Sequence, residues 1–168
     1  MRKDNGTVPS PIMIALRPAT IEDATIVFEW RNADDVRAIS ESKKELTIRR
    51  HMKWFAERLL LTHPESIWMV TSLTNIDGSE GVSVGAVRIL LDGKHYARIS
   101  VVIASKHRGR GIGRQAIKLI AEKVRGMKRI AVARVHVTNL VSQRAFIACG
   151  FHVVIDNLEN SFIELQAS

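Results

Sequence analysis

The chain has 168 residues, of which 25 are lysine or arginine and 17 are aspartate or glutamate, so its formal net charge is +8. This length suits one domain with a real core, and 46% hydrophobic with 25% charged residues excludes a largely disordered or fibrous chain. The single cysteine, Cys149, excludes an internal disulfide and argues against a cysteine-based metal site. We therefore expect a protein of the reducing cytoplasm that holds no metal.

The stretch MRKDNGTVPSP at the start of the sequence contains no apolar signal core. No other stretch approaches the roughly 18–20 apolar residues needed to span a bilayer, so we expect no membrane partner. Residues 1–11 are predicted to form a flexible tail, because they combine glycine, prolines and charges without a periodic pattern. Residues 12–168 are predicted to form a single domain.

The first part of this domain alternates between strand and helix patterns. Residues 12–19 form a short apolar run that Pro18 closes, which is typical of a strand. Thr20 is a candidate N-cap for a helix that extends to Trp30, with apolar residues at spacings of three and four. Residues 47–61 repeat this spacing and predict a second helix.

Three β-rich runs occupy the middle of the chain, at residues 66–73, 82–91 and 96–104. The segments between them, NIDGSEG and DGK, carry the glycine and aspartate residues typical of turns. This pattern predicts an antiparallel meander of three strands.

The last part of the chain alternates again between the two patterns. Its predicted elements are a helix at 112–127, a strand at 130–137, a helix at 139–149 and strands at 151–156 and 161–165. Gly126 and Gly150 are placed to end the two helices. The whole order predicts an α+β fold around a central mixed sheet, in which residues 96–137 form a β-loop-α-β unit.

Positive charge is concentrated between Ala104 and Arg129, where Glu122 is the only acid. Such a segment favours a polyanionic partner. Nucleic acid is not the partner we expect, because the chain has a single tyrosine, Tyr96, and lacks both an aromatic ladder and zinc-finger spacing.

The basic segment begins with a glycine-rich turn, SKHRGRGIGRQAI at residues 105–117. The turn lies directly after a predicted strand and directly before a predicted helix. Glycines allow a close approach of the backbone, and a helix N-terminus offers free N–H groups with a positive dipole, so a pyrophosphate can bind there. The glycines at 109, 111 and 113 match neither the dinucleotide fingerprint G-x-G-x-x-G nor a Walker loop.

Residues 96–152 resemble the acyl-CoA-binding half of the GNAT superfamily of N-acetyltransferases. The family pattern Arg/Gln-x-x-Gly-x-Gly/Ala is met by residues 108–113. A second signature, Asn-x-x-Ser/Ala followed by an aromatic residue and Gly-Phe, is met by Asn139, Ser142, Phe146, Gly150 and Phe151. The resemblance implies a GNAT-like mixed, mostly antiparallel sheet of about seven strands with helices on both faces. It also implies acetyl-CoA as co-substrate, without a metal.

The resemblance assigns the acetyl-CoA site residue by residue. Pantetheine would lie along residues 101–103 where this strand parts from the next, and the pyrophosphate would lie on the backbone around residues 110–114. Asn139 would contact pantetheine, or cap its helix, or both. The residues implied for acetyl-CoA are Val101, Val102, Ile103, Arg108, Gly109, Arg110, Gly111, Ile112, Gly113, Arg114, Asn139, Ser142 and Phe146.

Phe146 departs from the family pattern, because many GNAT enzymes have a tyrosine at this position that is thought to protonate the departing thiolate. Phenylalanine cannot donate a proton. We therefore expect Phe146 to be an apolar wall beside pantetheine. The thiolate would then leave without protonation, or take its proton from water, the attacking ammonium, Ser142 or Cys149.

Residues 14–61 resemble GNAT members that acetylate nucleotide-linked amino-deoxysugars, notably in pseudaminic-acid biosynthesis. The residues expected to bind the acceptor are Trp30, Arg31, Asn32, His51 and Trp54. Aromatic faces stack on rings, and arginine or histidine can bind a diphosphate, so these residue types suit a sugar nucleotide.

A base must take the proton of the acceptor ammonium. The candidates are Glu29, His51, Ser100 and His136, and the sequence does not rank them. Two alternative functions stay open at this stage. One is acetylation of a protein N-terminus or another small amine, and the other is a module that binds CoA or nucleic acid without turnover. A homodimer is also left open.

Overall fold

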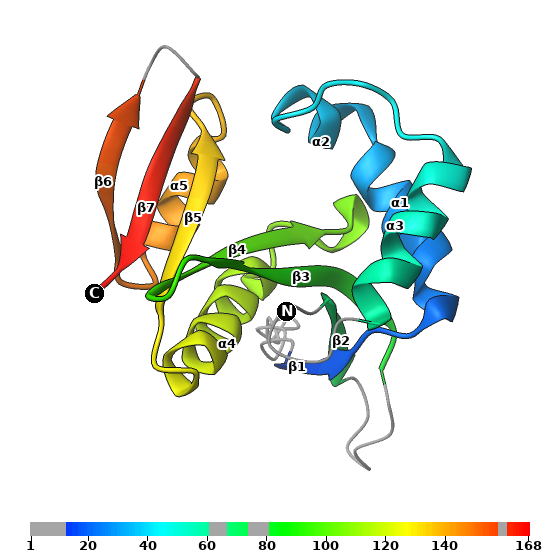
Figure 1. Cartoon of the computed structure of the whole chain (residues 1–168), viewed down its shortest axis with the longest axis horizontal. Coiled ribbons are helices and arrows are strands. Elements are labelled where there is room, and N and C mark those ends of the chain that lie inside the picture. The colour runs from blue at the N-terminus through cyan, green and yellow to red at the C-terminus, as the bar shows by residue number, and fades with distance from the viewer. Residues whose placement is uncertain (1–12, 61–66, 74–80, 158–160) are drawn as a thin grey trace, which may run out of the picture.

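The computed structural model describes residues 13–60, 67–73, 81–157 and 161–168, and these residues form one mixed sheet covered by helices (Figure 1). The strands are β1 (Met13–Pro18), β2 (Ile67–Leu73), β3 (Ser83–Asp92), β4 (Tyr96–Ile103), β5 (Ile130–His136), β6 (Phe151–Asn157) and β7 (Phe162–Ala167). The helices are α1 (Ala24–Asn32), α2 (Asp34–Ala38), α3 (Ile48–Leu60), α4 (Ile112–Gly126) and α5 (Leu140–Ile147). The tail expected at residues 1–11 lies outside the described residues.

The strand order within the described residues is β1-β2-β3-β4-β5-β7-β6, seven strands in all. Strands β1 to β4 pair antiparallel in sequence, which confirms the predicted meander. Strand β5 pairs parallel to β4 across α4, as the β-loop-α-β unit requires. Among the α-helices of the described residues, α2 was not expected from the sequence. It has five residues, none of them buried, so it carries no apolar periodicity.

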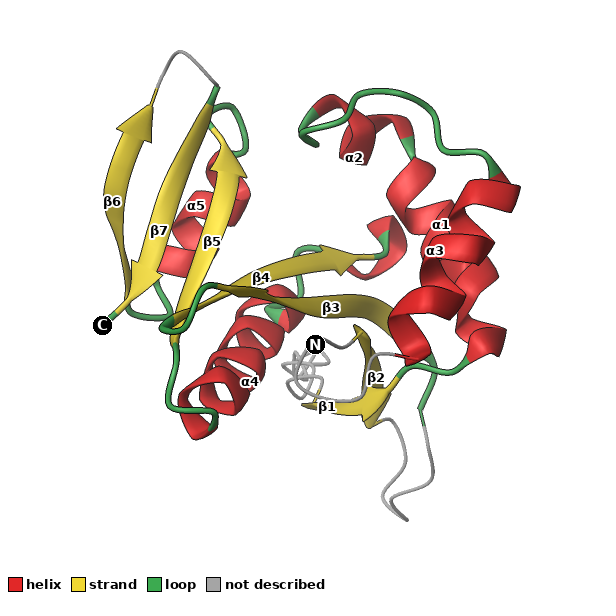
Figure 2. Ribbon diagram, viewed as in Figure 1, coloured by secondary structure: helices red, strands yellow, loops and turns green. Residues whose placement is uncertain are grey.

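Two apolar cores lie on the two faces of the sheet, which confirms the expected α+β architecture. One core joins α4 and α5 to the sheet through residues such as Ile120, Phe146 and Ile99. The other joins α1 and α3 through Val27 and Phe55. Figure 2 shows α4 and α5 grouped apart from α1 and α3.

The pairing between β4 and β5 is short. Residues 96–98 of β4 face residues 130–132 of β5, and beyond them the two strands diverge (Figure 1). Both strands continue past the divergence, β4 to Ile103 and β5 to His136. A wedge therefore opens in the middle of the sheet, at the place where the family resemblance implies pantetheine.

The alternation along β4 shows which backbone groups face this wedge. Alternate residues of an antiparallel strand turn their N–H and C=O groups to the partner strand. The Ala104 N–H donates to the Val84 carbonyl at 2.9 Å, so residues 100, 102 and 104 pair with β3. Ile99 and Val101 consequently turn their backbone groups toward the wedge. An extended chain such as pantetheine fits this row of donors and acceptors.

Candidate active site

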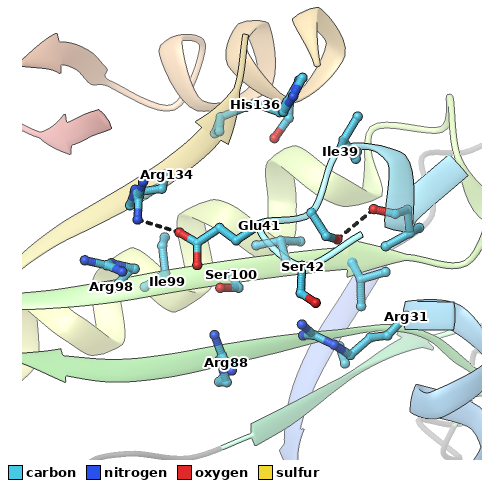
Figure 3. Close-up of a pocket in the computed structure, with 18 of the residues that line it drawn as sticks. Arg31, Ile39, Glu41, Ser42, Arg88, Arg98, Ile99, Ser100, Arg134 and His136 are labelled. Atoms are coloured by element: carbon cyan, nitrogen blue, oxygen red, sulfur yellow. Dashed lines mark hydrogen bonds and ion pairs between the residues drawn. The ribbon is translucent and has the colours of Figure 1, made fainter. Parts of the chain in front are cut away.

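A cavity of about 420 Å³ lies where β4 and β5 diverge. Its walls come from β3, β4, β5 and α5, and α2 with the segment after it lies along its rim (Figure 3). The residues that line the cavity include Ser100 and Val101 of β4, His136 of β5 and Phe146 of α5. The cavity therefore adjoins the row of backbone groups on β4.

The charged side chains that line the cavity are mostly cationic. They are Arg31, Arg37, Lys44, Arg88, Arg98 and Arg134, with Glu41 the one acid among the described lining residues. Figure 3 shows Arg31, Arg88, Arg98 and Arg134 around the side chain of Glu41. Three of these arginines lie in mostly apolar strands, Arg88 in β3, Arg98 in β4 and Arg134 in β5.

Aromatic rings hold several of these arginines in place. The guanidinium carbons of Arg31 and Arg88 lie 5.8 and 5.7 Å from the ring centre of Trp54. Arg134 lies 5.3 Å from the ring centre of Phe162. A guanidinium held on an aromatic face keeps its N–H edge free for an anion.

Burial lowers the pKa of Arg88 to about 10, with Arg31, Arg58 and Arg98 adding to the shift and Glu41 opposing it. Burial also lowers the pKa of Arg31. Arg88 nevertheless stays protonated at neutral pH, because a pKa of about 10 lies well above 7. The cavity thus concentrates positive charge at low exposure, which favours an anionic ligand.

The segment between α1 and α3 is tied down on both sides of the wedge. Asp35 of α2 pairs with Arg108, which follows β4, and Glu41 pairs with Arg134 of β5 at 2.6 Å. The Asn32 amide donates to the Leu46 carbonyl at 3.3 Å and accepts from the Leu46 N–H at 2.9 Å, which closes the segment. These contacts explain how a segment with little apolar content covers the cavity.

The glycine turn lies between the end of β4 and α4. Gly109 and Gly111 have φ angles of +75° and +77°, a left-handed conformation that strains other residues. Gly111 is the N-cap of α4, and its carbonyl accepts the N–H of Gln115 at 3.2 Å. The N–H groups of residues 112–114 therefore have no partner within the helix. A Cβ at Gly109 or Gly111 would meet no atom within 4 Å, so the turn is open to a ligand.

The residues implied for acetyl-CoA divide into two groups. Val101, Val102, Asn139, Ser142 and Phe146 line the cavity, whereas residues 108–114 lie outside its lining. Phe146 is 3% exposed, and the centre of its ring lies 5.0 Å from the centre of the Phe151 ring. This packing is in keeping with an apolar wall. The Asn139 side chain accepts from the Ser142 N–H at 3.1 Å and so caps α5.

Arg108 and Ile103 are held by contacts within the protein. The Arg108 Nε donates to the Ile103 carbonyl at 2.9 Å, and its guanidinium pairs with Asp35. Ile103 is packed against the core that contains α4. Arg110 and Arg114 are exposed and free to approach a phosphate.

The residues expected to bind the acceptor are only partly brought together. Arg31 and Trp54 line the cavity, but Trp30, Asn32 and His51 do not. Trp30 packs against the core beneath α1, and Asn32 holds Leu46. His51 is 3% exposed, and its Nε2 lies 3.0 Å from the Ala24 carbonyl. The aromatic motif around His51 is therefore an interior packing motif, with rings of Phe28, Trp54 and Phe55 within 5.6 Å.

The interior position of His51 gives a pH dependence of stability. Burial lowers its pKa, with Arg31 adding to the effect and the hydrogen bond to Ala24 opposing it. A histidine in the unfolded chain has a pKa near 6.5, and the pKa of His51 in the folded protein is lower. The unfolded state therefore binds more protons below about pH 6.5, and the free energy of unfolding should fall as the pH drops. We expect the His51→Gln variant, whose amide can still donate to Ala24, to lose less stability between pH 7 and 5. Urea denaturation at both pH values measures this; equal losses in the two proteins would contradict it.

Two of the four base candidates, Ser100 and His136, line the cavity. Glu29 is exposed on α1 and is not among the lining residues. The His136 Nδ1 lies 3.3 Å from the Thr138 N–H and 2.8 Å from its hydroxyl. Because a backbone N–H only donates, this nitrogen accepts and a neutral ring carries its proton on Nε2.

Glu41 and the strand arginines were not expected from the sequence. Glu41 is a charged residue in a segment without periodicity, and no sequence signal distinguishes it. The arginines could have been found, because Arg88, Arg98 and Arg134 each interrupt an apolar strand. A charged side chain in the middle of an apolar strand rarely occurs without a reason.

Two further features concern metals and membranes. Within the described ranges, no three His, Cys, Asp or Glu side chains are arranged to hold a metal ion. Among the described helices, none has the length and apolar character to cross a membrane.

Solved structures of low sequence identity share this fold. A domain from Methanocaldococcus jannaschii has a TM-score of 0.79 at 20% identity, over 93% of this chain and 98% of that chain. A spermidine N-acetyltransferase from Vibrio cholerae, in complex with CoA and spermine, has a TM-score of 0.76 at 14% identity, over 91% and 94%. A ribosomal-protein-alanine N-acetyltransferase from Brucella melitensis has a TM-score of 0.68 at 19% identity, over 90% and 98%.

The sequence itself supports a family assignment. No curated protein matches the chain. The model of the acetyltransferase (GNAT) domain matches residues 14–152, which include the wedge, the glycine turn and all but the last strands of the sheet. The protein therefore belongs to the GNAT acetyltransferase family.

Proposed function

We propose that this protein acetylates the primary amine of a nucleotide-linked amino-deoxysugar, by direct attack of the amine on the thioester of acetyl-CoA. As a GNAT enzyme, it is an acyl-CoA-dependent N-acetyltransferase. The observation that carries the acceptor proposal is the cationic cavity, which is lined by Arg31, Arg88, Arg98 and Arg134 beside the expected thioester position.

The acetyl-CoA half of the site follows from the backbone. Pantetheine pairs with the groups that Ile99 and Val101 turn to the wedge, and the pyrophosphate binds at the start of α4. Backbone N–H groups of β4 then lie beside the thioester carbonyl, where they stabilise the charge that develops during attack. These groups are fixed by the sheet and need no rearrangement.

The acceptor half of the cavity suits an amine that also carries an anionic group. A diphosphate offers several oxygen acceptors to the guanidinium groups of Arg31 and Arg88. The Trp54 ring, over which both guanidinium groups lie, also lines the cavity. A polyamine such as spermine, bound in the Vibrio cholerae structure, would meet like charges here.

The proton of the acceptor ammonium leaves through the cavity. Ser100, acting through water, and His136 are the two candidate bases that line it. His136 accepts at Nδ1 from Thr138, so its Nε2 presents a proton donor rather than a lone pair. Ser100 with water is therefore our first candidate for proton removal.

Release of free CoA thiol from acetyl-CoA tests the acceptor directly. The panel consists of an amino-deoxysugar linked to a nucleoside diphosphate, a short peptide with a free N-terminus, and spermidine, at equal concentrations. We expect kcat/KM for the sugar nucleotide to exceed the others by at least about tenfold, because one lost charged contact gives a factor of this order. A preference for the peptide would overturn the acceptor. Acetyl-CoA binding without thiol release from any amine would indicate a module without turnover.

Phe146 gives a second test of the chemistry. Its ring lines the cavity and packs in the core, so we expect turnover that needs no phenolic acid. The Phe146→Tyr variant should bind acetyl-CoA as the parent does, with kcat unchanged or raised. In kcat measured against pH, only the variant should show an alkaline limb near the tyrosine pKa of about 10. A parent that is inactive on every amine and is rescued by Phe146→Tyr would contradict this expectation.

A further inference from the structure

Glu41 stands in an unusual position for a loop carboxylate. It extends from the segment after α2 into the group formed by Arg31, Arg88, Arg98 and Arg134, which we call the arginine cluster (Figure 3). Its carboxylate pairs with Arg134 at 2.6 Å, and the two side chains are 57% and 31% exposed. Its charge also acts on Arg88.

The arginine cluster does not depend on Glu41 for its arrangement. Trp54 supports Arg31 and Arg88, and Phe162 supports Arg134. Arg98 is held by Asp92 at 3.0 Å. The cluster would therefore keep its shape if the carboxylate left.

The cluster also has more donors than the described residues satisfy. The Nε atoms of Arg88 and Arg98 are buried and have no hydrogen-bond partner within the described part of the chain. Arg31 and Arg88 form no ion pair there either. Buried charged donors without acceptors are costly, so their presence indicates a ligand that supplies the acceptors.

We infer that Glu41 is an internal stand-in for the anionic group of the acceptor, which displaces its carboxylate from the arginine cluster on binding. This inference rests on the proposed function, in which the anionic group is a diphosphate. The diphosphate has more charge and more acceptor oxygens than one carboxylate, and it can form the bidentate contacts that guanidinium groups favour.

Glu41 is placed so that it can leave. Its ion pair is partly exposed, and such pairs add little net stability. Asp35 and Arg108 would still tie α2 to the end of β4 after the pair breaks. An amine without an anionic group would leave Glu41 in the cluster, so only anionic acceptors have to compete with this carboxylate.

The experiment is a calorimetric titration with inorganic pyrophosphate, on full-length protein saturated with CoA so that the glycine turn is already occupied. We expect Glu41→Gln to lower the pyrophosphate Kd about tenfold, because a competing carboxylate is removed. We expect Arg88→Gln to raise the Kd at least about tenfold. Thermal melting of each variant checks that it is folded.

Matched variants control for net charge. Glu45→Gln removes the same charge from the exposed part of the same segment, and Arg125→Gln removes an exposed arginine from the end of α4. Each should leave the Kd within about twofold of the parent. Equal effects of Glu41→Gln and Glu45→Gln, or no saturable binding to the parent and to Glu41→Gln, would overturn the inference.

The titration involves no turnover, so its result is separate from the test of the acceptor. A protein that prefers a peptide in the thiol-release panel, but binds pyrophosphate more tightly after Glu41→Gln, would overturn the sugar nucleotide and keep the anion site. The reverse combination would keep the acceptor and overturn the role of Glu41.

Discussion

Gly111→Asp should weaken acetyl-CoA binding by about 100-fold, or about 2.7 kcal/mol. Gly111 caps α4 with a φ of +77°, and a side chain there points into open space at the expected pyrophosphate position. The substitution therefore places a negative charge against the phosphates and removes the attraction of the helix N-terminus for them. Equilibrium titration of acetyl-CoA measures the loss.

Gly93→Asp is the matched control for this variant. Gly93 also has a positive φ, +61°, and open space around its Cβ position, but it lies in the turn before β4, at the opposite end of that strand. Both variants carry the same charge change and a similar left-handed strain, on the order of 1–2 kcal/mol. Only Gly111→Asp should lose affinity for acetyl-CoA. Equal binding by the two variants would place the pyrophosphate elsewhere.

Gly85→Ala should lower the free energy of unfolding by about 3 kcal/mol, at the upper end of ordinary overpacking. Gly85 lies on β3 opposite Ile103, and a Cβ there would stand 2.4 Å from the Val102 carbonyl oxygen. Because that atom belongs to the backbone of β4, the strand that faces the wedge must move. We therefore expect weaker acetyl-CoA binding together with a fall in Tm of roughly 6–12 °C.

Gly126→Ala is the control for Gly85→Ala. Gly126 ends α4, and a Cβ there would meet no atom within 4 Å. Alanine is the better helix former by roughly 0.5–1 kcal/mol, so this variant should be as stable as the parent or more stable. Chemical denaturation distinguishes the two. A Gly85→Ala protein with unchanged stability would show that β3 and β4 are not as closely packed as the structure has them.

The fold was predictable because local patterns agree with the global arrangement. The alternation of residues 66–104 predicts three strands with short turns, and Gly126 ends α4 as expected, whereas α5 ends at Ile147, three residues before Gly150. The divergence of β4 and β5 could not be seen in the sequence, because nothing local to either strand limits their pairing to residues 96–98 and 130–132. It entered only through the family resemblance.

The acceptor side was less predictable, for a physical reason. The sequence singles out aromatic and histidine side chains, but it does not tell whether a helix turns them to the cavity or to the core. His51 and Trp30 face the core beneath α1, whereas Arg31 and Trp54 line the cavity. Three members of the arginine cluster, Arg88, Arg98 and Arg134, come from three different strands. Only the folded sheet brings them together.

Comparison of one amino-deoxysugar with and without its nucleoside diphosphate tests most directly whether the arginine cluster selects the acceptor. Both compounds carry the same reactive amine, so they differ only in the group that the cluster would bind. We expect kcat/KM to be about 100-fold or more higher for the nucleotide-linked sugar, because several charged contacts form with the diphosphate alone. Equal kcat/KM for the two compounds, with thiol release from both, would contradict an acceptor held through its anionic group.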